Sequence, residues 1–184
     1  MASRIKFWLW AAGCLGGILV LLYWLDQVLN DGNIAVYIMK KLNPSFFHNN
    51  PCNLDYTGTQ WNGLADPPSY VHGTHTFCSF STAHYGLRAA GMNVVHIIRM
   101  GKTTYQELGE TWAPASDNAG ATDYGANLAK QLGKSETDAV EYGTAAALSL
   151  LLAAIVKNEN SVCPYATTTL YDAALDALQS AGIA

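Results

Sequence analysis

The sequence predicts a mainly α-helical protein in which an N-terminal transmembrane helix precedes a small helical domain with one lobe of loops and a short β-hairpin. Three observations lead to this fold class. Residues 7–25 carry no charge, residues 49–80 are rich in Gly, Pro and Asn without a helical period, and apolar residues recur at helical spacing after residue 82. We therefore divide the chain into a cytoplasmic N-terminus and anchor (1–30), a juxtamembrane segment (31–44) and an outward-facing globular domain (45–184).

The predicted anchor is a run of 19 uncharged residues, which as a helix would span roughly 28 Å, about the thickness of a bilayer's hydrocarbon core. Arg4 and Lys6 precede it, so we expect a single-pass signal anchor with a cytoplasmic N-terminus and a periplasmic or external C-terminal domain, or a place in a virion membrane. A cleaved signal peptide is the competing interpretation, although the DQVLNDG that follows is a poor cleavage site. Gly13 and Gly17 could let two anchors touch in a homo-oligomer, or could be ordinary glycines of a membrane helix.

Helices are expected through most of the second half of the chain. Thr82 can cap a helix that continues to about residue 100, and Thr104 with Glu107 has the spacing of a capping box. Ser135 and Asp138 mark a short turn. The apolar run 144–159 is expected to be a buried central helix, because sixteen residues ending in Lys and Glu are too short for a membrane span. The other helices are expected over residues 122–133 and 168–181.

Five short motifs occur in order within about 70 residues: NNPCNL (49–54), WNGL (61–64), FCSF (77–80), YGLRA (85–89) and WAPASDN (112–118). This block resembles that of tailed-phage and prophage virion structural proteins, which reads approximately NNPGNI, W-x-G-L, F-x-x-F, Y-G-I-R-A and W-A-P-P-S-E-N. The chain departs from the block at Cys52, Ala115 and Asp117. The resemblance implies a virion structural protein, and together with the predicted anchor it gives a membrane-anchored one whose external domain contacts other virion or envelope proteins or the cell wall. It also implies a buried ion pair at Arg88, with Asp117 as a candidate partner.

A more distant resemblance gives a second hypothesis. Bacterial cell-wall glucosaminidases have segments similar to NNPCNL, WNGL and FCSF after the helix that carries their catalytic glutamate. Here the comparable helix end, NENSVCPY at residues 158–165, follows that lobe. The resemblance therefore implies a permuted, lysozyme-like domain and a membrane-anchored peptidoglycan glycosidase, lysozyme-like or transglycosylase-like, with Glu159 as general acid. The alternative is a structural or surface glutamate, so whether the chain is an enzyme stays open.

The residue types of the lobe suggest a binding groove, since Asn and aromatic side chains suit the polar edges and apolar faces of sugars. The candidate substrate-binding residues are Asn49, Asn50, Tyr56, Trp61, Trp112 and Asp117. Packing within the lobe is the equal alternative for Tyr56 and Trp61, and capping of the next segment is the alternative for Asp117. An enzyme needs Glu159 in an open cleft that faces residues 49–64, whereas a structural module can place it anywhere.

The cysteines, the histidine spacing and the net charge limit which bonds, cofactors and partners the protein can have. In an oxidising compartment Cys52 and Cys78 could form a disulfide across the lobe. No C-x-x-C motif or histidine cluster has metal-site spacing, so we expect no metal and no cofactor. The net charge of −4, with ten basic residues, argues against nucleic-acid binding. The expected partners are membrane lipid, other virion or envelope proteins and, for an enzyme, peptidoglycan.

Overall fold

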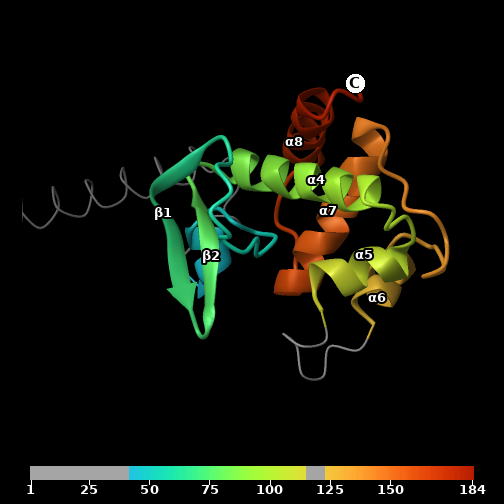
Figure 1. The fold of residues 1–184 in the computed structure, drawn as a ribbon, viewed down its shortest axis with the longest axis horizontal. Coiled ribbons are helices and arrows are strands. Elements are labelled where there is room, and N and C mark those ends of the chain that lie inside the picture. The colour runs from blue at the N-terminus through green and yellow to red at the C-terminus, as the bar shows by residue number, and fades with distance from the viewer. Residues whose placement is uncertain (1–41, 115–122) are drawn as a thin grey trace, which may run out of the picture.

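The computed structural model describes residues 42–114 and 123–184, which form six helices and one two-stranded sheet (Figure 1). The short helix α3 (Pro44–Phe47) comes first, followed by the hairpin of β1 (Leu64–His72) and β2 (His75–Phe80). The remaining elements are all helices: α4 (Ala83–Arg99), α5 (Tyr105–Trp112), α6 (Tyr124–Gln131), α7 (Ala145–Asn160) and α8 (Thr167–Ser180).

The predicted fold class and localisation require correction. Within residues 42–114 and 123–184, every helix is too short or too polar to cross a bilayer. This finding contradicts the predicted transmembrane helix followed by a lysozyme-like domain, and with it the predicted single-pass membrane localisation. The uncharged stretch at 7–25 and its Gly13–Gly17 pair, on which those predictions depended, lie outside the described residues. The fold class is corrected to a helical domain with a small two-stranded sheet.

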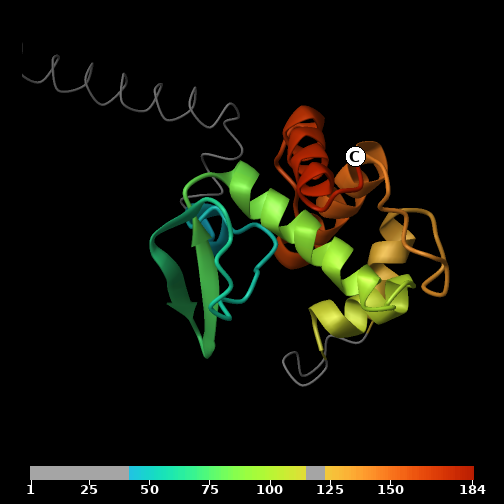
Figure 2. The same cartoon turned by 45° about the horizontal axis from the view of Figure 1, so that its top comes forward.

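The core lies where α4, α7 and α8 pack together (Figure 2). Leu87, Leu148 and Leu152 are fully buried within it, as is Ala177 of α8. Gly91 permits the close approach of α4 to α8, because a Cβ there would lie 2.9 Å from the Cβ of Ala177. Truncating one of these buried leucines to alanine typically costs about 2–5 kcal/mol, so each contributes substantially to stability. As predicted, α7 is a buried helix, and it ends after 16 residues.

The pair α5 and α6 packs on one end of this core. Thr104 and Glu107 form the predicted capping box at the start of α5. The two helices approach closely at Gly109 and Gly125, where a Cβ on Gly109 would lie 2.3 Å from the backbone nitrogen of Gly125. Only glycine fits such a backbone contact. The close packing fixes the start of α6, and therefore Tyr124, against α5.

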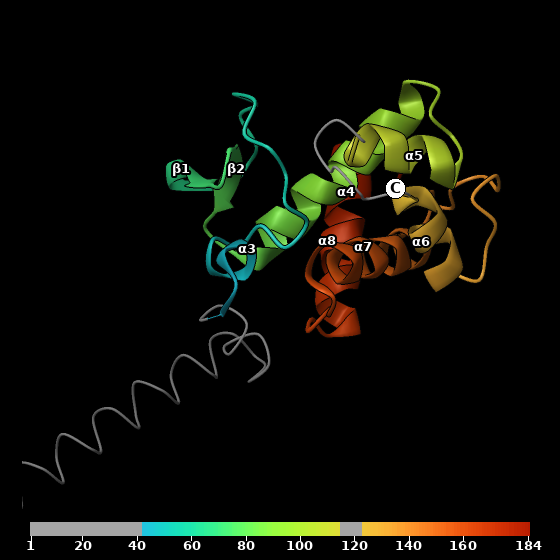
Figure 3. The same ribbon diagram turned by 90° about the horizontal axis from the view of Figure 1, so that it is seen from below.

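The lobe consists of α3, the loop that follows it and the hairpin, and it joins the helices at the start of α4 (Figure 3). The antiparallel register pairs Tyr70 with Phe77, with an irregularity between Leu64 and Ser69. Gly86 of α4 lies against the lobe, because a Cβ there would lie 2.0 Å from the carbonyl oxygen of Asn49. The glycine of YGLRA therefore brings the lobe and the helical core together.

The helix expected from residue 122 begins at Tyr124. The short turn predicted at Ser135 and Asp138 is confirmed, and it is closed by a bond from the Ser135 N–H to the Asp138 carboxylate. Arg88 is buried and forms an ion pair, but its partner is the partly exposed Asp176 of α8, with Nε 3.0 Å from Oδ1. The suggested partner, Asp117, lies outside the described residues.

Candidate active site

The site is built around Glu159, in the last turn of α7. The apolar residues before it hold α7 in the core, so the end of the helix emerges beside the lobe. The Tyr124 hydroxyl donates to Oε1 of Glu159 at 2.6 Å, and Nδ2 of Asn53 donates to Oε2 at 2.9 Å. The side chain of Trp112 also hydrogen-bonds to this carboxylate. Three segments far apart in the sequence therefore meet at one carboxyl group.

Burial raises the pKa of Glu159 above its ordinary value, and the negative charge of Asp55 adds to this rise. The hydrogen bonds from Tyr124, Asn53 and Trp112 oppose the rise, because they stabilise the ionised form. The net direction is upward. A carboxyl group with a raised pKa holds its proton to higher pH, which is the property that a general acid needs near neutrality.

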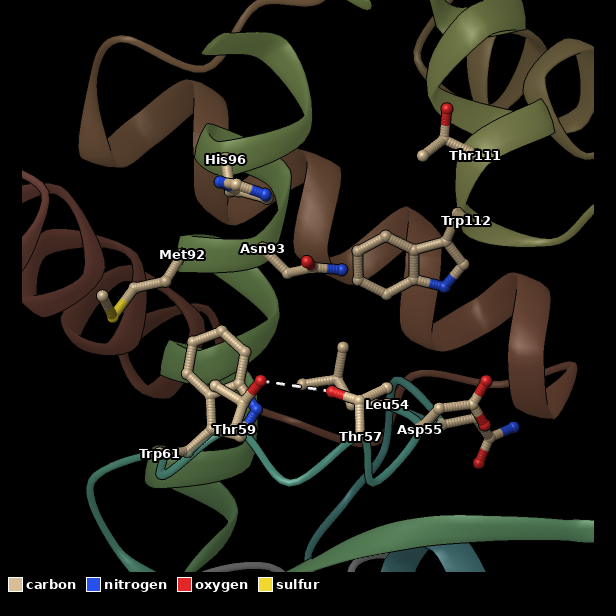
Figure 4. Close-up of a pocket in the computed structure, with 11 residues that line it drawn as sticks. Leu54, Asp55, Thr57, Thr59, Trp61, Met92, Asn93, His96, Thr111 and Trp112 are labelled. Atoms are coloured by element: carbon tan, nitrogen blue, oxygen red, sulfur yellow. Dashed lines mark hydrogen bonds between the residues drawn. The ribbon is translucent and has the colours of Figure 1, made fainter. Parts of the chain in front are cut away.

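Two neighbouring cavities open beside this carboxyl group. The smaller, of about 180 Å³, is lined by Glu159 together with Asn53, Asp55 and Trp112, and by His75, Phe77, Ala113 and Pro114. The larger, of about 560 Å³, is also lined by Asn53, Asp55 and Trp112 (Figure 4). Because Asn53, Asp55 and Trp112 line both cavities, the two are adjacent, and we refer to them together as the cleft. Glu159 lines the smaller cavity, beside Asn53 and Asp55 of the lobe.

Asp55 supplies a second carboxylate to the cleft. It follows the NNPCNL motif directly, and its backbone forms an isolated antiparallel bridge with Phe77 of β2. Its side chain is 55% exposed, and Oδ1 lies 4.0 Å from Nδ1 of His75. The cleft thus has one largely buried acid, Glu159, and one exposed acid, Asp55. Paired carboxyl groups in different environments are typical of glycoside-cleaving sites.

The neighbour of Glu159, Asn160, fastens the helix end to the lobe. Its Nδ2 donates to the carbonyl of Pro51 at 2.7 Å, and its Oδ1 accepts from the hydroxyl of Ser45 at 2.6 Å and from Nδ2 of Asn43 at 2.9 Å. The Asn160 side chain thus uses both its donor and its acceptor in this junction. The junction fixes the distance between α7 and the loop that carries Asn53.

The residues predicted to bind substrate have different positions in the structure. Trp61 and Trp112 line the larger cavity. Asn49 and Asn50 hold the lobe together instead: Asn49 donates to the carbonyl of Phe80, and the fully buried Asn50 exchanges two hydrogen bonds with the backbone of Leu54. Tyr56 packs half-buried against the core. Asp117 lies outside the described residues.

Several residues of the cleft were not predicted from the sequence. Asn53, Asp55 and Tyr124 surround Glu159, and one face of α4, with Met92, Asn93 and His96, lines the larger cavity. Asp55 had a local signal, since it is an acid next to an Asn-rich motif. The others had none, because the hydrogen bond from Asn53 to Glu159 spans 106 residues and that from Tyr124 spans 35.

The disulfide expected between Cys52 and Cys78 is absent, and Cys52, Cys78 and Cys163 are all free thiols. The thiol of Cys78 is directed to the backbone carbonyl of Asp55 at 3.4 Å. Cys52 is fully buried instead near Glu159 and Cys163, and burial raises the pKa of its thiol. The two cysteines therefore have different surroundings, and both thiols have raised pKa values.

No protein-family model matches this chain, and no curated protein is similar enough to it in sequence to count as a match.

Proposed function

We propose that this chain is a glycosidase that cleaves the glycan strands of peptidoglycan, with Glu159 as the general acid. The observation that carries the proposal is the position of Glu159. Its carboxyl group is largely buried, has a raised pKa and lines a cleft formed by the lobe and the helices. This is the arrangement that the sequence analysis required of an enzyme.

The chemistry follows from the two carboxyl groups. Protonated Glu159 donates its proton to the glycosidic oxygen, so that the leaving sugar departs as an alcohol while positive charge develops on the other ring. Asp55 lines the same cleft and supplies a negative charge that stabilises this transition state or activates the attacking water. Water then completes the hydrolysis: its oxygen bonds to the anomeric carbon, one of its protons stays on the new hydroxyl, and the other returns to Glu159, either directly or through Asp55 and solvent. Tyr124 and Asn53 are positioning residues, because they hold the two oxygens of Glu159.

The resemblance to virion structural proteins remains a prediction from the five motifs. It is compatible with the glycosidase proposal, since a protein carried in a virion could cut the cell wall on entry. No feature of the described residues favours a purely structural role over a role in cleavage.

The test is release of muropeptides from purified peptidoglycan by the full chain, by Glu159→Gln and by Glu141→Gln. Glu141 is an exposed glutamate that pairs with Lys134 and lines neither cavity, so its variant is a matched control. General acid catalysis contributes about 10²–10⁴-fold, so Glu159→Gln should lose at least about 100-fold in rate while Glu141→Gln keeps the parental rate. A folded parent that releases nothing, or a Glu159→Gln variant as active as the parent, would overturn the proposal.

A further inference from the structure

We propose that the larger cavity, hereafter the α4 cavity, is a subsite for an N-acetylated pyranose. The inference deepens the proposed function, because the sugar bound here would belong to the glycan strand that Glu159 cuts. It concerns the side of the cleft formed by α4, none of whose residues the sequence analysis singled out for binding.

The walls of the α4 cavity come from three elements (Figure 4). His96 follows Asn93 by three residues and Met92 by four, so the three side chains share one side of α4. Trp61 comes from the loop before β1, and Trp112 ends α5. Both indole rings are partly buried, which leaves apolar surface for a ligand.

The charge of the lining favours a neutral ligand. Among the described residues that line the α4 cavity, none is Lys or Arg, and the one carboxylate is Asp55. A phosphate or nucleotide would therefore meet a carboxylate and no ammonium or guanidinium group. The remaining polar groups are the imidazole of His96, the amides of Asn53 and Asn93, and three threonine hydroxyls, of which those of Thr57 and Thr59 lie 3.2 Å apart. Two aromatic rings with scattered neutral polar groups suit a pyranose, which has an apolar face and polar edges.

The acetamido group is inferred from Asn93. Figure 4 shows its side-chain amide directed into the α4 cavity, toward the ring of Trp112. An amide side chain offers both donors and an acceptor, so it can bond the N–H and the C=O of an acetamido group together. The thioether of Met92, on the same wall, is an adaptable apolar contact for the acetyl methyl group. A sugar with a hydroxyl at that position would leave part of this amide without a partner, and such a loss lowers affinity.

The α4 cavity also has a defined relation to Glu159. Asn53, Asp55 and Trp112 line both this cavity and the smaller one that contains Glu159. A ring bound between Trp61 and Trp112 would therefore be followed along the strand by the bond presented to Glu159. The subsite would position the scissile bond as well as recognise the sugar.

The experiment uses the full chain carrying Glu159→Gln, which should bind without cleaving. Isothermal titration calorimetry would compare the β-1,4-linked tetramer of N-acetylglucosamine with the β-1,4-linked tetramer of glucose, which differs at the acetamido positions. We expect the acetylated tetramer to bind at least tenfold more tightly. Asn93→Ala in the same background should abolish that preference, Trp61→Ala should weaken binding of both tetramers, and the exposed Asn127→Ala of α6 should change neither.

Equal affinity for the two tetramers, no binding of the acetylated tetramer, or a preference that survives Asn93→Ala would each overturn the subsite. The result is separable from the test of cleavage. Binding that depends on Asn93, in a chain whose parent releases no muropeptides, would support the subsite and reject the glycosidase. Muropeptide release that depends on Glu159, with tetramer binding insensitive to Asn93, would support the glycosidase and reject the subsite.

Discussion

At the scale of single residues, the acidity of Glu159 depends on the balance between its burial and its three hydrogen-bond donors. Burial raises its pKa, and the hydrogen bond from Tyr124 is the first of the contacts that lower it. Tyr124 is itself largely buried, and its own pKa is raised, so it stays a neutral donor over the range in which Glu159 titrates. The two residues therefore act as a unit in which the phenol favours the ionised carboxylate.

Tyr124→Phe should raise the pKa of Glu159 further, because it removes a donor that stabilises the charged form. A general acid works in its protonated form, so kcat/KM falls as pH rises through the pKa of Glu159. The alkaline limb of the pH profile should therefore move to higher pH in Tyr124→Phe. The same direction should appear in an NMR titration of the labelled Glu159 carboxyl carbon. Tyr171→Phe, an exposed tyrosine of α8, is the control, and an unmoved titration in Tyr124→Phe would contradict the argument.

A second residue-scale prediction concerns Asp176, which joins α8 to α4. Burial alone would raise its pKa, but the hydrogen bonds from His84 and Arg88 lower it overall. An acid with a lowered folded pKa stabilises the protein above its unfolded pKa, about 3.9, and loses that contribution as pH falls through the folded value. Asp176→Asn should therefore destabilise at pH 7, and the difference from the parent should vanish at low pH.

The expected loss at pH 7 is about 1–2 kcal/mol. The Arg88 side chain is only 7% exposed and would lose its anionic partner, but Asp176 is 40% exposed and the interaction is partly screened. Urea unfolding at a series of pH values from 7 down to about 2 would measure it. Asp172→Asn, an exposed position of the same helix, should change little at any of these pH values. An Asp176→Asn deficit that stays constant over the whole series would show that packing, and not charge, is the cause.

At the scale of elements, the cleft depends on how the lobe meets α4. Gly86→Ala should damage that contact, because the new Cβ would lie 2.0 Å from the carbonyl oxygen of Asn49 and backbone must move to admit it. Overpacking of this kind costs about 1–3 kcal/mol, outweighing the higher helix propensity of alanine, up to about 1 kcal/mol. We expect a lower free energy of unfolding and weaker saccharide binding together.

Gly143→Ala is the matched control for this change. A Cβ at Gly143 would meet nothing within 4 Å, so its stability should stay within about 0.5 kcal/mol of the parent. Urea unfolding and calorimetric binding of the acetylated tetramer would be measured on both variants. A Gly86→Ala protein with parental stability and binding would show that the lobe is not held by this contact.

The elements that sequence predicts well are those determined by local chemistry. Thr82, Thr104 and Thr144 each cap a helix in the structure, because a threonine hydroxyl that accepts from a backbone N–H three residues ahead is a short-range signal. The start of α6 was misplaced because Asp123 adopts a left-handed conformation, with φ of 79°, and makes no side-chain cap. The transmembrane prediction depended on the uncharged length of residues 7–25 and on Arg4 and Lys6 before it, all of which lie outside the described residues.

The candidate site was predictable only in part, for a related reason. Glu159, Trp61 and Trp112 were identified because an acid at a helix end and aromatic rings in a loop are recognisable by type. The residues that surround them in the site are brought there by tertiary contacts, which the periodicity of the sequence does not reveal. Asn49 and Asn50 show the opposite error, since asparagine bonds backbone as readily as ligand, and here both side chains bond the backbone of the lobe.

At the scale of the whole molecule, the described residues differ in the free energy needed to open the segments that contain them. The helices α4, α7 and α8 share one core of fully buried side chains, whereas none of the nine residues of β1 is fully buried. Regions with few buried contacts open locally at low free energy, and shared cores open only with global unfolding. Amide hydrogen exchange should therefore be slow in α4, α7 and α8, and much faster in β1.

Saccharide binding should change this pattern of amide exchange in a specific way, because the cleft lies between the lobe and the helices. In the Glu159→Gln chain, the tetramer of N-acetylglucosamine should slow exchange in the loop that carries Asn53, Asp55 and Trp61, since a ligand adds its binding free energy to the cost of opening any segment that it contacts. The turn at residues 134–138 has no part in either cavity and serves as the internal control. Mass spectrometry of peptic peptides, with and without the tetramer, would measure both. Protection of the loop with an unchanged turn is the expected outcome. Equal protection of both, or protection of neither at saturating ligand, would contradict the assignment of the cleft.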